Sequence, residues 1–160
     1  MKAVFKLVGT QKFLSNVKKI QKKVPDASRM GMLMATELLR GYIVKYKLSG
    51  QRLKVRTGRL RTSIEKEVSG KGLDIVGRVG SNLKYARIHE LGGPTEDITI
   101  VPVRAKALHF FIGGQEIFCR AVHMPAFAIK PKYYIKQSMR ETAKRLTRIM
   151  GNKIFMELKK

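Results

Sequence analysis

The stretch ASRMGMLMATELLRGYIVKYKL, residues 27–48, decides the fold of this 160-residue chain. Its apolar residues recur every three or four positions, which is the spacing of one helix face. Pro25 and Asp26 precede it, and Ser49 and Gly50 end it. The spacing predicts a main core helix capped by Asp26. Its stripe consists of Met30, Met34, Leu38, Tyr42 and Tyr46, with Leu39 and Ile43 beside it.

Two further helices are expected, one before and one after this stretch. The first begins at the capping residue Thr10 and ends near Val24, because Pro25 lacks the backbone donor that a helix interior needs. Its apolar residues are Phe13, Val17, Ile20 and Val24. The last helix is expected over residues 133–158. Its apolar face is expected to hold Ile135, Met139, Ala143, Leu146, Ile149 or Met150, and Ile154.

Strand patterns occupy the start and the middle of the chain. Alternating polarity predicts a strand over residues 2–8 and strands in the middle, joined by glycine-rich turns. Gly113-Gly114 gives the clearest hairpin signal, because both glycines tolerate the positive φ of a tight turn. The sequence therefore predicts an α+β fold, a mainly antiparallel sheet packed against two long helices in a single domain, residues 1–160. The expected middle elements are strands at 64–68, 73–79, 98–103, 108–112 and 117–122, a short helix at 85–91, and irregular segments at 51–56 and 124–131.

Positive charge is the most unusual global property, with 34 Lys and Arg against 11 Asp and Glu and a net charge of +23. The excess lies at both ends, since residues 1–56 hold fourteen cations against two acids and the last thirty hold nine against two. Such charge favours polyanionic partners, either nucleic acid or acidic protein surfaces, or it simply solvates the surface. The chain lacks a membrane-length apolar run and a signal-peptide pattern, so we expect synthesis in the cytoplasm and no membrane partner.

Catalytic motifs are not evident in the sequence. The three histidines are scattered, and the single Cys119 is typical of a small buried side chain in a strand. A metal nuclease needs clustered acids, and only Glu90, Glu96 and Asp97 lie close together. We therefore expect no catalytic residues, no cofactor, no metal site and no enzymatic activity.

A basic ridge is predicted on the last helix, where Lys136, Arg140, Lys144 and Arg148 recur every four residues. The ridge is either a solvated face or a surface that binds phosphates or an acidic subunit. Two irregular segments are candidate assembly loops, one basic and one apolar. Their candidate partner-binding residues are Arg52, Lys54 and Arg56 in the first, and Met124, Phe127 and Ile129 in the second.

The middle of the chain carries four ordered motifs. They are VRTGRLRTSI at residues 55–64, GSNLKYARIHELGG at 80–93, IVP with AKALHF at 100–110, and IKPKYYI at 129–135. Together they resemble the tail-completion, or neck, proteins of tailed bacteriophages, a family of head–tail joining and minor tail proteins. The chain departs from that pattern at residues 132–134, where an arginine and a Phe-Leu pair are expected. The residues that match the first two motifs are Thr57, Gly58, Leu60, Ser63, Ile64, Tyr85, Ala86, His89, Glu90 and Gly92.

The resemblance implies a non-catalytic virion protein of the head–tail junction. It implies a ring, commonly a hexamer, that completes the tail and joins it to the head connector. The implied partners are other copies of the chain, the head connector or head-completion protein, and the tail terminator or tail tube protein, with genomic DNA nearby. The alternative, which the charge supports, is a basic nucleic-acid-binding protein without catalytic activity.

Overall fold

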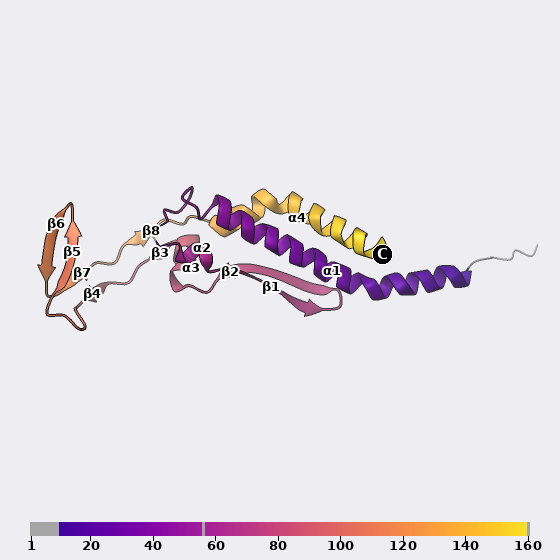
Figure 1. The fold of residues 1–160 in the computed structure, drawn as a ribbon, viewed down its shortest axis with the longest axis horizontal. Coiled ribbons are helices and arrows are strands. Elements are labelled where there is room, and N and C mark those ends of the chain that lie inside the picture. Colours follow the sequence, from indigo (N-terminus) through magenta and orange to yellow (C-terminus); the bar gives the residue numbers. More distant parts are fainter. Residues whose placement is uncertain (1–9, 56, 160) are drawn as a thin grey trace, which may run out of the picture. The chain divides into compact units, whose positions relative to one another are not determined.

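The computed structural model describes residues 10–55 and 57–159, and the chain separates into two compact units. The first unit contains residues up to Leu83 and from Tyr134 onward, and the second runs from Lys84 to Tyr133. Each unit is described by itself (Figure 1). The strand expected over residues 2–8 lies outside the described residues, as does Arg56.

Helix α1 dominates the first unit and runs without a break from Thr10 to Tyr46, with Pro25 inside it. The predicted break at Pro25 is therefore wrong, and Asp26 lies within the helix instead of capping it. A proline removes one backbone donor from the helix ladder. The turns that follow Pro25 pack against α4, and this packing supports the continuous helix.

The buried face of α1 differs from the predicted stripe by about one position. Met30, Met34 and Tyr46 are exposed, whereas Ala27, Ala35, Leu39 and Ile43 are buried. The small side chains of the buried face let α4 approach closely, since a Cβ on Gly31 would lie 3.2 Å from Ile154 Cγ1. The sequence places the large methionines on the core face because they are the more apolar residues. The close packing of the two helices instead buries the small residues.

Helix α4, Tyr134–Lys159, confirms the predicted last helix and lies beside α1 (Figure 1). Its buried residues are Tyr134, Ser138 and Thr142, whereas Met139 and Ala143 of the predicted apolar face are exposed. The two hydroxyl residues satisfy themselves within the helix, because Ser138 Oγ donates to Tyr134 O at 2.6 Å and Thr142 Oγ1 donates to Ser138 O at 2.7 Å. Burial therefore leaves neither hydroxyl without a partner.

A β-hairpin packs against α1, with strands β1, Ile64–Lys71, and β2, Asp74–Ser81. The hairpin confirms the prediction, although its strands are longer and its turn lies at Gly72 and Leu73. A Cβ on Gly77 would lie 2.5 Å from Thr36 Cγ2, so glycine permits the close approach of β2 to α1. The short helix α2, Arg59–Thr62, leads into β1.

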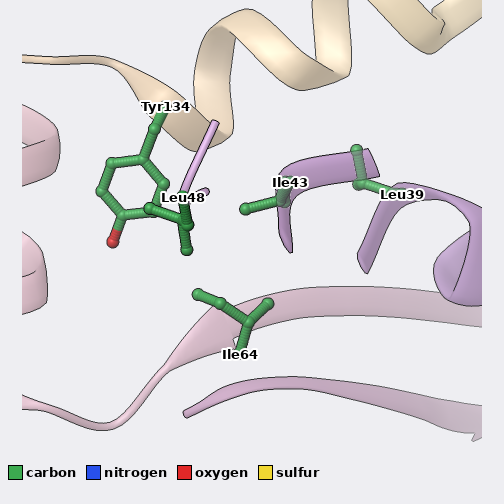
Figure 2. Close-up of a cluster of buried hydrophobic side chains, with 5 residues drawn as sticks. All are labelled: Leu39, Ile43, Leu48, Ile64 and Tyr134. Carbon is green, nitrogen blue, oxygen red and sulfur yellow. The ribbon is translucent and has the colours of Figure 1, made fainter. Parts of the chain in front are cut away.

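The core of the first unit is one small cluster where α1, α4 and β1 meet. Leu39 and Ile43 of α1 converge with Leu48, Ile64 of β1 and Tyr134 of α4 (Figure 2). Ile43 and Tyr134 are fully buried, and Ile64 is 1% exposed. The cluster therefore joins three elements that are far apart in the sequence.

The second unit consists of α3, Lys84–Leu91, and a series of short antiparallel strand pairs. Its hairpin turn is confirmed, because Gly113 and Gly114 have φ of 59° and 86°. Residues 98–103 and 117–122 form shorter or shifted strands, and the segment 124–131 includes strand residues instead of being wholly irregular. The pairs are β3, Gly93–Pro94, with β8, Ala128–Ile129; β4, Ile98–Ile100, with β7, Val122–Met124; and β5, Leu108–Ile112, with β6, Gln115–Cys119.

The mixed class of helices and antiparallel strands is confirmed. The strands form four separate two-stranded sheets in the described chain, so the expected main sheet is not formed. The short pairs reflect the interruptions at Pro102 and Pro125, which cannot donate to a ladder. The single-domain organisation stays a prediction.

Candidate assembly surfaces

The first family motif forms the turn that leads α2 into β1. Gly58 has φ of 73°, a left-handed conformation that favours glycine, at the start of α2. Leu60 packs against the core cluster, and Ile64 belongs to it. Ser63 Oγ and Ser81 Oγ lie 2.7 Å apart and close the base of the hairpin. These motif residues therefore have structural roles within the first unit.

The second motif forms α3 and its C-terminal stop. Ala86 is buried, and Gly92 ends the helix with φ of 74° while its N–H donates to Ile88 O at 2.8 Å. His89 O accepts a hydrogen bond from Lys132 N at 2.9 Å, and Glu90 O accepts one from Tyr133 N at 3.1 Å. The end of α3 thereby fixes the returning chain, including the segment that departs from the family pattern.

A polar network joins α1 to α4 beside the core. Glu141 accepts hydrogen bonds from the buried Lys47 at 2.9 Å and from Tyr42 at 2.8 Å. Lys47, and then Tyr42, hold the pKa of the Glu141 carboxyl below its ordinary value, and the same carboxylate raises the pKa of Tyr42. The network therefore favours an ionised Glu141 and a neutral Tyr42.

A second ion pair joins α1 to the hairpin. Lys66 Nζ lies 2.6 Å from Glu37 Oε2, and Arg40 donates to Glu37 Oε1 at 3.0 Å. Lys66, and then Arg40, lower the pKa of the Glu37 carboxyl. The pairs are at the surface, so they orient the hairpin more than they stabilise it.

The predicted basic ridge is exposed along α4. All four cations, Lys136, Arg140, Lys144 and Arg148, are exposed, on the side of the helix away from Ser138 and Thr142. Four-residue spacing brings neighbouring cations together, which costs a few tenths of a kcal/mol per pair. The ridge is therefore a positively charged surface that an acidic partner would stabilise.

Both candidate loops expose their predicted residues in part. Arg52 and Lys54 are exposed, while Leu53 between them packs against the core of the first unit. In the other segment, Phe127 is 55% exposed although its backbone is held by Thr95, whose Oγ1 accepts from Phe127 N at 2.9 Å. Met124 is also exposed, and Ile129 is half-buried in β8.

A family model matches residues 11–92 of the chain; its description is "Bacteriophage HK97-gp10, putative tail-component". The chain belongs to the HK97-gp10-like family. The match covers more than half of the chain and confirms the resemblance to phage tail proteins. No curated protein and no solved structure matches the chain significantly.

The family match covers only part of the four motifs. It includes α1, α2, the β1–β2 hairpin and α3, and therefore both of the motifs that hold the family residues named above. The motifs at residues 100–110 and 129–135 lie beyond it, as do the ridge and the apolar loop. As a member of this family, the chain is a structural tail component that interacts with other phage proteins.

The remaining candidate chemistry is local. His109 Nε2 lies 2.7 Å from Glu116 Oε1, and its ring stacks on Phe118 with centroids 4.6 Å apart. Cys119 is half-buried, less than predicted. Within residues 10–55 and 57–159, no group of three or more His, Cys, Asp or Glu is placed to hold a metal ion. In the same ranges, no helix has the length and apolar character needed to cross a membrane.

Two features of the structure were not predicted from the sequence: the ion pairs between elements and the exposed apolar residues of α1. The Lys47–Glu141 and Glu37–Lys66 pairs join residues far apart in the chain, and no sequence signal marks such pairs. The apolar residues near the start of α1 have the predicted helical spacing, but most of them are exposed. The lysines around them are the sequence signal for this exposure, because lysine is rarely buried and so many lysines do not fit a helix that is buried on several sides.

Proposed function

We propose that this chain is a structural virion protein of the phage head–tail junction. It forms a ring, with six copies as the expected number, that completes the tail and joins it to the head connector. One face of the ring contacts the head connector or head-completion protein, and the other contacts the tail terminator or tail tube. The observation that carries the proposal is membership in a family of phage tail components.

The distribution of apolar residues supports an assembly role. Ala86 is the one buried residue described between Lys84 and Tyr133. In the same unit Phe111 and Phe118 are each 65% exposed. Two-stranded ribbons with exposed aromatic residues are marginal alone in water, so neighbouring subunits are expected to cover them.

Protein, and not DNA, is the favoured partner of the basic ridge. A ring through which DNA passes must release it, yet several phosphate contacts per subunit, repeated around the ring, would hold DNA tightly at moderate salt. An acidic protein surface satisfies the same cations without that obstacle. The ridge is therefore assigned to docking on an adjacent ring.

Complementation of a phage that lacks the gene tests the assignment. Without the protein, heads and tails are expected to accumulate unjoined in electron micrographs, and the wild-type gene restores joined particles. Joined, infectious particles in the absence of the protein would contradict the proposal. So would a requirement for the protein before any tail tube assembles.

Charge reversal tests the ridge separately. Arg140→Glu with Lys144→Glu is expected to weaken joining, most strongly at low salt, because salt screens exposed charges. Each exposed pair contributes only about 0 to 1 kcal/mol, but the pair recurs in every subunit. The matched control reverses Lys71 and Arg145, two exposed cations outside the ridge. If the ridge variant and the control variant had equal effects on joining, the ridge would be only a solvated surface and not a docking surface.

The apolar loop is tested by Phe127→Ser. The backbone of Phe127 is held by Thr95, so the variant is expected to fold normally and to lose joining. The basic loop is tested by Lys54→Glu, which leaves the packed Leu53 in place. Normal joining by both variants would remove the two loops from the proposed interface.

A further inference from the structure

The first part of α1, residues 10–24, is an exposed arm of the helix. From residue 11 to residue 23 every side chain is exposed except Val17, which is half-buried. Phe13 is 67% exposed and Leu14 is 56% exposed. Most of the arm extends beyond the C-terminal end of α4, whose last turns lie beside residues 23–31 of α1 (Figure 1).

The apolar residues of the arm continue the face on which α4 packs. A helix turns by about 100° per residue, so Phe13, Val17, Ile20 and Val24 fall within an arc of roughly 60°. Gly31 and Ala35, which form the seam with α4, fall within the same arc. A helical partner in line with α4 would therefore extend an existing helix–helix interface over the arm.

The charges of the arm define the chemistry of that partner. Residues 10–25 contain five lysines and no acidic residue. The lysines occupy the arc opposite the apolar stripe, and the nearest two, Lys12 and Lys23, flank it at roughly 60° to 80° from its edge. They are Lys12, Lys18, Lys19, Lys22 and Lys23. A partner that covers the stripe must therefore carry acidic residues on its flanks.

A second copy of the chain does not meet this requirement. The chain has 11 acidic residues, and four of them already form ion pairs with its own lysines and arginines: Glu37, Glu67, Glu141 and Glu157. Two more, Asp97 and Glu116, lie against the side chains of His123 and His109. Two arms packed together would oppose ten lysines. DNA would neutralise the lysines but leave the apolar stripe in water.

We propose that the arm, residues 10–24, is a docking helix for an acidic amphipathic helix of a different protein. Apolar residues of the partner cover Phe13, Val17 and Ile20, and flanking carboxylates face the lysines. This inference does not depend on where in the virion the chain acts.

Binding of model helices to the full chain tests the proposal. The probe is a fluorescein-labelled 21-residue peptide with leucine at helical i, i+3, i+4 and i+7 spacing and glutamate beside the leucines. One comparison peptide has lysine in place of glutamate, and another has the same composition in scrambled order. Fluorescence anisotropy at about 0.15 M salt is expected to show the acidic amphipathic peptide binding at least tenfold more tightly than either comparison peptide.

Variants of the arm separate the two contributions. Phe13→Ser with Ile20→Ser is expected to weaken binding at least tenfold, and Lys19→Glu with Lys23→Glu is expected to do the same. The control, Gln11→Ser with Gln21→Ser, lies on exposed polar positions and is expected to change binding less than twofold. Circular dichroism checks that each variant keeps its helix content.

Several results would overturn the proposal. One is equal binding of the acidic and scrambled peptides. Another is self-association in sedimentation that the Phe13 and Ile20 substitutions abolish, because a second copy would then be the occupant. A third is binding to a 20-base-pair duplex or to phosphatidylglycerol vesicles that is tighter than peptide binding and lost in the same variant.

Discussion

Replacement of Ile64 by alanine tests whether the first family motif is structural. Ile64 is 1% exposed and meets Ile43 and Tyr134 in the core cluster. Loss of the three outer carbon atoms costs about 2.4 kcal/mol in transfer free energy, at about 0.8 kcal/mol per carbon. The remaining cavity adds roughly 1 kcal/mol, so the free energy of unfolding is expected to fall by about 3 to 4 kcal/mol.

Urea unfolding followed by circular dichroism at 222 nm measures this loss. With a slope of about 2 kcal/mol per molar urea, the midpoint is expected to fall by about 1.5 M or more. Ile64→Val should lose about 0.5 to 1.5 kcal/mol, and Val76→Ala, exposed on β2, should change little. A loss below 1 kcal/mol for Ile64→Ala, or one equal to that of Val76→Ala, would refute the assignment of Ile64 to the core.

Three further substitutions test the polar network and the glycines. Glu141→Gln should lower stability at neutral pH and flatten its decline in acid; a wild-type-like acid profile by urea unfolding would contradict this. The native carboxylate has a lowered pKa, so its contribution is present above the ordinary value of 4.5 and is lost as pH falls through the folded-state pKa. Gly41→Ala should raise the free energy of unfolding by about 0.5 to 1 kcal/mol, and with it the thermal midpoint, because Gly41 lies in α1 with nothing within 4 Å of a Cβ. A lowered midpoint would show strain there. Gly92→Ala should cost about 1 to 2 kcal/mol, because φ is 74° and a Cβ would lie 2.8 Å from Pro131 Cδ; faster amide exchange in α3 measures the loss, and unchanged exchange would contradict it.

The local elements were predictable because their signals are local. Gly113-Gly114 fixed the hairpin turn, Gly92 ended α3, and the four-residue spacing of cations placed the ridge on the exposed side of α4. These features depend on backbone conformation and helical period, which a few adjacent residues determine.

The packing between elements was not predictable in the same way. Met30 and Met34 are more apolar than Ala27 and Ala35, yet α4 packs on the small residues because they allow close approach. Pro25 signalled a helix end, but its effect depends on what supports the turns around it. The Lys47–Glu141 pair of the first unit joins residues separated by most of the chain, and no local pattern encodes it.

A cryo-EM map of the assembled particle tests the proposed function most directly. We predict a closed ring of this chain between the head connector and the tail tube, with Arg140 and Lys144 facing an acidic surface of an adjacent protein ring. A map that places the chain elsewhere in the particle, or finds it absent from the mature virion, would contradict the account.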